Sequence, residues 1–78
     1  PITTIRFDIP EESRVSIDIY NVMGQKVAEV VDAHYQPGFY TVNWAGTNTL
    51  GGALSSGMYF YRIQAKDFTA VKKLLLVK

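Results

Sequence analysis

Apolar and polar side chains alternate along most of this 78-residue chain, which is the period of a β-strand whose two faces meet different surroundings. The alternation is clearest at 5–9 and 15–19, where every second residue is isoleucine, valine or phenylalanine. Further strands are expected at 26–31, 39–44, 58–65 and 69–78. No stretch shows the 3.6-residue period of a helix. The spacing of about ten residues between strands predicts about seven strands in all.

Turn-forming residues separate these segments. Pro10 lies in a polar turn at 10–13, and Gly24 is expected to adopt a positive φ in the next turn. A loop is expected at 32–38, and the longest one at 45–57, which is rich in Gly, Ser, Thr and Asn. We therefore predict one all-β domain over 1–78, an antiparallel sandwich of immunoglobulin or fibronectin III type. A small barrel is the alternative.

The expected last strand, 69–78, breaks the alternation. Four consecutive apolar residues, 74–77, put apolar side chains on both faces, and lysines flank them. Only one face of a sandwich strand is buried in its own core, so one pair of apolar residues remains unexplained. Either Leu74 and Leu76 or Leu75 and Val77 form that second pair.

Composition excludes several classes of protein. There is no cysteine, so neither a disulfide nor a thiolate metal site supports the fold. No stretch reaches the roughly 18 apolar residues of a membrane-spanning helix, and no signal-peptide pattern opens the chain. Because the first strand starts almost at once, we expect a fragment of a longer secreted protein. Residues 66–78 hold four lysines against one aspartate, so the C-terminal end is basic.

The residues available for chemistry are few. His34 is the only histidine, and we interpret it as an ordinary loop residue. Asp8, Asp18 and Asp32 are expected on solvated strand positions or in turns. We predict no enzyme activity, no metal and no cofactor. The lysines near the end lack the interleaved aromatics of a nucleic-acid site, so no nucleic-acid partner is expected. Trp44 is expected in the core, although a sugar-binding platform is an alternative.

The chain resembles a known family along nearly its full length. It is similar to the type A C-terminal sorting domains of the type IX secretion system of Bacteroidota, and to the immunoglobulin-like domain of flagellar hook-capping proteins. The matching segments are TTIRFDIP at 3–10, YNVMGQ at 20–25, GFYTVNWAG at 38–46, LSSGMYFYRI at 54–63 and KKLLLVK at 72–78.

The resemblance implies a signal that sends an N-terminal passenger of the same chain through the periplasm to the cell surface or medium. The implied partners are the outer-membrane secretion machinery and its signal-cleaving peptidase. Pairing of two copies through an edge strand is also considered. The residues expected to be recognised, or to shape the neighbouring strand, are Lys72, Lys73, Leu74, Leu75, Leu76, Val77, Lys78, Gly57 and Tyr59. The alternative function is a structural or carbohydrate-contacting accessory domain of a secreted enzyme.

Overall fold

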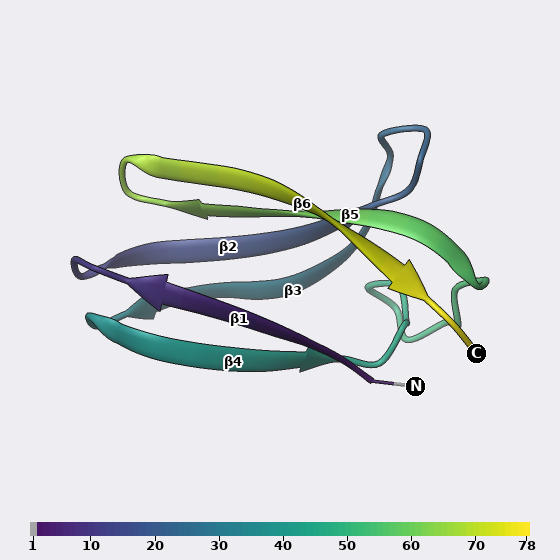
Figure 1. The fold of residues 1–78 in the computed structure, drawn as a ribbon, viewed down its shortest axis with the longest axis horizontal. Helices are drawn as coiled ribbons and strands as arrows, with labels where there is room; N and C mark the ends of the chain where they lie inside the picture. The colour runs from purple at the N-terminus through teal and green to yellow at the C-terminus, as the bar shows by residue number, and fades with distance from the viewer. Residues whose placement is uncertain (1) are drawn as a thin grey trace.

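Six strands and no helix make up the computed structural model, which describes residues 2–78 (Figure 1). The strands are β1 (Thr3–Ile9), β2 (Ser13–Tyr20), β3 (Lys26–Tyr35), β4 (Gly38–Trp44), β5 (Gly57–Ala65) and β6 (Phe68–Leu76). They form a two-stranded sheet, β1-β4, and a four-stranded sheet, β3-β2-β5-β6, in which every pair is antiparallel. The predicted all-β sandwich is confirmed.

The expected count of about seven strands is one too many. The remaining long segment, 45–56, holds only an isolated bridge between Thr47 and Ala53. The side chain of Asn48 accepts hydrogen bonds from the backbone N–H groups of Leu50 and Gly52, at 3.0 and 2.8 Å. Such local bonds compete with a sheet ladder, so this segment turns instead of extending.

The core lies between the two sheets and follows the alternation in the sequence. Val15, Ile17 and Ile19 of β2 have no exposed surface, and Ile5 of β1 has almost none. Each aliphatic side chain removed from water in this way stabilises the fold by about 1.5–3 kcal/mol before the entropy of ordering is counted. Trp44 is buried as predicted, and its indole N–H donates to the backbone carbonyl of Thr47 at 2.9 Å.

Side-chain contacts show that the two sheets cross at an angle. At one end, Phe7 of β1 packs edge-on against Tyr35 of β3, with 5.4 Å between ring centroids. At the other end, Leu76 of β6 lies against Gly46, just after β4. Figure 1 shows the same relation: β6 starts away from β4 and then descends toward the end of β4. The start of β6 is therefore less covered than its end.

The turn between β2 and β3 is built around Asn21. Its side-chain oxygen accepts hydrogen bonds from the backbone N–H groups of Met23 and Gln25, at 2.9 and 3.0 Å. Gly24 has a φ of 82°, as predicted, a value that residues with a Cβ rarely adopt. These contacts explain why the segment Asn-x-x-Gly-Gln forms this turn.

His34 lies in β3 and not in a loop as expected, because β3 continues to Tyr35 and pairs with the whole of β2. Its ring Nε2 lies 2.8 Å from Glu12 Oε2, and the amide of Gln36 donates to the same oxygen at 2.8 Å. These hydrogen bonds, first that with His34 and then that with Gln36, hold the pKa of Glu12 below its ordinary value of 4.5.

We expect the His34→Ala variant to raise the pKa of Glu12 toward 4.5, since the strongest hydrogen bond to the carboxylate is then gone. The folded-state pKa is lowered, so this small contribution to stability is present above the unfolded-state pKa and is lost as pH falls through the lowered value. Carboxyl-detected NMR titration measures the shift, and Gln36→Ala should produce a smaller rise. An unchanged pKa in His34→Ala would contradict this explanation.

Candidate recognition surface on the last strand

β6 is an edge strand of the four-stranded sheet and, within residues 2–78, pairs only with β5. The register places Met58 opposite Leu75, Tyr59 opposite Leu74 and Gly57 opposite Leu76. Along the other side of an edge strand, alternate backbone N–H and C=O groups have no partner strand, so they are available to one. The expected recognition residues of β5 and β6 therefore do lie side by side.

The apolar run at the end of the chain divides cleanly between core and surface. Leu74 and Leu76 are 8% and 1% exposed and pack in the sandwich, whereas Leu75 and Val77 are 64% and 62% exposed. Val71 lies four residues before Leu75, on the same face of the strand, and is also exposed. Val71, Leu75 and Val77 form the outward row of this strand. The unexplained pair is therefore Leu75 and Val77.

Leu76 packs against a glycine on the other side of the sandwich. A Cβ built on Gly46 would lie 2.9 Å from Leu76 Cδ1, closer than real Cβ contacts allow. Gly46 also has a φ of 74°. Nearby, the backbone N–H of Lys78 donates to Ser56 Oγ at 3.1 Å. Sequence reasoning missed the roles of Gly46 and Ser56, although the glycine belongs to the GFYTVNWAG segment.

Gly46→Ala should lower the free energy of unfolding by about 1–3 kcal/mol. A left-handed backbone costs a residue with a Cβ about 1–2 kcal/mol, and the side chain of Leu76 must also move. Urea denaturation followed by circular dichroism measures the change. Gly51→Ala is the matched control, because Gly51 has a similar φ of 89° with open space around it. An equal loss in both variants would show that the contact with Leu76 contributes nothing.

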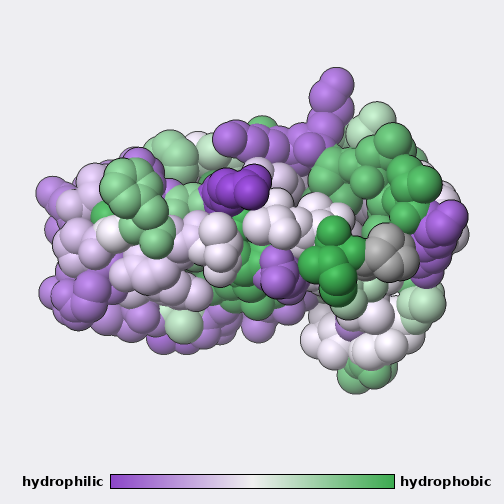
Figure 2. Space-filling view, turned by 60° about the horizontal axis from the view of Figure 1, so that its bottom comes forward, coloured by the Kyte–Doolittle hydropathy of each residue, from purple (hydrophilic) through white to green (hydrophobic). Residues whose placement is uncertain are grey.

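Tyr59 supports the start of β5 from inside the sandwich. It is buried, lies edge-on to Trp44 with 6.0 Å between ring centroids, and its hydroxyl donates to the carbonyl of Ser55 at 2.7 Å. Gly57 has a φ of 150°, which a side chain would strain. Both residues lie at the start of β5, beside the end of β6. Figure 2 shows apolar side chains gathered at this end of the molecule, where Figure 1 places the C-terminus.

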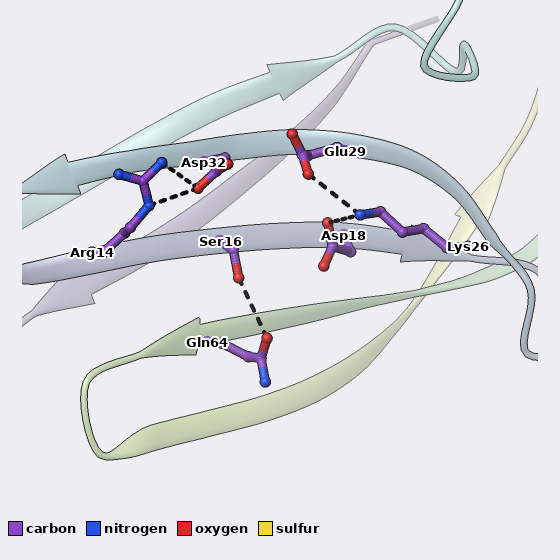
Figure 3. Close-up of polar contacts among 7 residues, drawn as sticks. All are labelled: Arg14, Ser16, Asp18, Lys26, Glu29, Asp32 and Gln64. Atoms are coloured by element: carbon purple, nitrogen blue, oxygen red, sulfur yellow. Dashed lines mark hydrogen bonds and ion pairs between the residues drawn. The ribbon is translucent and has the colours of Figure 1, made fainter.

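The acidic side chains on the outer face of β2 and β3 are engaged in ion pairs (Figure 3). Arg14 binds Asp32 at 2.8 Å, and Lys26 Nζ lies 3.3 Å from both Asp18 and Glu29. The expectation of a solvated face is wrong for Asp18, which is buried on the outer face with Lys26 Nζ beside its carboxylate. The carboxylate of Asp18, and after it that of Glu29, raises the pKa of Lys26 above its ordinary value.

The basic side chains of β6 have no such partners. Within residues 2–78, Lys72, Lys73 and Lys78 make no ion pair, and neither does Arg62 of β5, whose guanidinium lies 5.1 Å from the ring centroid of Tyr20. The end of β6 therefore combines an exposed aliphatic row, an open strand edge and uncompensated positive charge.

Comparison with known protein families shows which family the chain belongs to. A family model described as the CHU_C type IX secretion signal domain matches residues 2–77, nearly the entire chain. The chain belongs to this family. Comparisons with curated proteins and with solved structures gave no significant match. The signal domain therefore acts as a C-terminal sorting signal that directs export toward the cell surface or medium, and its partner is the secretion machinery.

A secretion signal domain family is not a catalytic one. Residues 2–78 contain no cluster of three His, Cys, Asp or Glu side chains that could hold a metal ion. The same residues include no helix of the length and apolar character needed to cross a membrane.

Proposed function

We propose that this signal domain carries an N-terminal passenger of the same polypeptide through the periplasm to the outer-membrane machinery, which recognises the end of β6. The recognised segment is 72–78, and Gly57 and Tyr59 hold β5 in the position that displays it. The signal-cleaving peptidase of the system then separates domain and passenger. The machinery adds a strand of its own to the open edge of β6.

One observation supports this proposal above the others: adjacent apolar residues at the end of β6 alternate between core and solvent. Leu75 and Val77 point outward beside an unpaired strand edge, while Leu76 anchors the strand. In strand addition, backbone hydrogen bonds give affinity and alternate side chains give specificity. Burying these two exposed side chains would give the partner most of its apolar contact.

The charges on β6 disfavour a second copy of the domain as the partner. β6 contains Lys72 and Lys73 and no acidic residue, and Lys78 follows it. Antiparallel pairing of two β6 edges would bring like charges together without compensation, and like charges in opposed positions destabilise a sheet pair. Lysines on an edge strand commonly have this effect. We therefore propose a partner strand that carries acidic side chains.

Reporter export tests the proposed function directly. Residues 1–78 are fused to the C-terminus of a fluorescent protein that has a periplasmic export signal, and the fusion is produced in a host with a type IX system. We expect fluorescence in the medium or on the cell surface. The same host without the system should keep the fusion in the periplasm, as should the reporter alone. Retention of the fusion in the competent host would refute the proposal.

The accessory-domain alternative is not favoured. Its carbohydrate-binding form depended on an exposed aromatic platform, and Trp44 is buried with its N–H already bonded. The family match also indicates a secretion signal.

A further inference from the structure

The two sheets of the sandwich differ in width, and β1 lies at the edge where the narrow sheet stops covering the wide one. The four-stranded sheet spans about 14 Å between its outer strand axes, whereas the two-stranded sheet spans about 5 Å. In the part of the chain that the structure describes, β1 pairs only with β4, so its other edge is open. Because the sheets cross, the uncovered part of the wide sheet is the inner face of the β5–β6 hairpin next to β1.

A groove follows this open edge. Two hollows of about 160 and 120 Å³ adjoin there, and Asp8 of β1 and Phe68 of β6 line both. Their lining is mixed, because charged side chains such as Lys72 and Lys66 lie beside apolar ones. Among the apolar side chains, Phe68 is 54% exposed, and Tyr61 and Ala70 are only partly buried. The other sheet covers these inward-facing side chains less completely than it covers Leu74 and Leu76. The groove runs along the open edge of β1, where one additional strand could pair with it.

The outward face of β1 carries two opposite charges with no partner. Arg6 and Asp8 are exposed, alternate with the buried row of β1, and make no ion pair within residues 2–78. Their neighbours across the ladder on β4 are Thr41 and Phe39, which are uncharged. A strand on the open side of β1 would place its own outward residues directly beside both charges.

We infer that the open edge of β1 binds one extended strand of a partner protein, antiparallel to β1. The strand has an acidic residue opposite Arg6, a basic residue opposite Asp8, and aliphatic residues between them that cover Phe68 and Ala70. This surface lies on the inward side of β6, where Lys72 lines one of the hollows, whereas Leu75 and Val77 lie exposed on the outward side.

A second copy of the domain does not fit this groove. The β5–β6 hairpin extends past β1 on the open side, since Phe68 lines both hollows beside that edge and Ala70 lines one of them. Joining two β1 edges about a two-fold axis would place the two hairpins in the same space. The part of the wide sheet that the narrow sheet leaves uncovered has room for a single strand. It has no room for a second domain whose own wide sheet would lie in the same layer.

Two peptides of identical composition test the inference. Read against β1 in antiparallel order, Thr-Val-Lys-Val-Glu-Val-Thr matches both charges, and Thr-Val-Glu-Val-Lys-Val-Thr opposes both. The chain is labelled with ¹⁵N and titrated with each capped peptide while its amide signals are followed by NMR. We expect the matched peptide to shift signals of β1 and of Phe68 and Ala70, and to bind roughly tenfold more tightly than the opposed one.

Exchanging the charges on the domain provides the decisive control. The double variant Arg6→Asp with Asp8→Arg alters only exposed positions and should reverse the preference between the peptides. Equal binding of both peptides to the natural chain would overturn the proposed pairing of the partner's charges with Arg6 and Asp8. Absence of shifts along β1 with either peptide would overturn the inference, as would β1 shifts that depend on domain concentration alone, which would indicate a second copy. None of these results changes what reporter export shows.

Discussion

Replacing Leu76 by alanine should lower the free energy of unfolding by about 2–5 kcal/mol, the range for truncating a buried leucine. Its side chain is 1% exposed and fills the space left open at Gly46. A domain of this size has little stability to spare, so a loss at the upper end would leave much of the chain unfolded. Urea denaturation followed by Trp44 fluorescence measures the change.

Leu75→Ala is the matched control, because it removes the same atoms one residue earlier. Leu75 is largely exposed, so we expect a change within about 0.5 kcal/mol. Similar losses in both variants would mean that the end of β6 is not docked as described. A loss in Leu75→Ala alone would mean that the strand faces the opposite way.

The double variant Leu75→Ser with Val77→Ser should reduce export of the fused reporter roughly tenfold or more. If the machinery buries these two side chains, their removal weakens binding by more than the about 1.4 kcal/mol that corresponds to a factor of ten. The domain should keep its fold, since both side chains are exposed. Quantitative fluorescence of medium and cells measures export, and circular dichroism of the purified domain checks folding.

Val22→Ser with Met23→Ser controls for a general loss of surface hydrophobicity. These residues are at least as exposed but lie in the β2–β3 turn, so export should be unchanged. Deleting 74–78 would be a weaker experiment, because it also removes Leu74 and Leu76 from the core. Normal export of the Leu75 and Val77 variant would move recognition away from the outward row.

Alternation predicted the strands, because a period of two can be detected within a single strand, and the spacing of the turns predicted the sandwich. The buried rows at Ile5, Ile17 and Trp44 fall where it placed them. The errors came from contacts with other strands or from local turns. His34 was assigned to a loop, but pairing with β2 extends β3 through it. Asp18 was assigned to solvent, but it is buried with Lys26 Nζ beside its carboxylate.

The candidate site was only partly predictable for the same reason. The sequence showed that two apolar pairs occupy opposite faces near the end of the chain, but period alone does not say which pair faces inward. The register with β5 and the contact between Leu76 and Gly46 decide it. The groove beside β1 was not predictable, since it results from the angle between two sheets.

The position of Leu76 between Leu75 and Val77 links display of the signal to the state of the whole domain. A strand has a fixed phase, so the two outward side chains are presented on a regular edge only while the residue between them remains docked. An unfolded tail offers the same residues without that geometry. Under the proposed function, the domain would act as a checkpoint: the fraction of molecules competent for export would follow the folding equilibrium of their last strand.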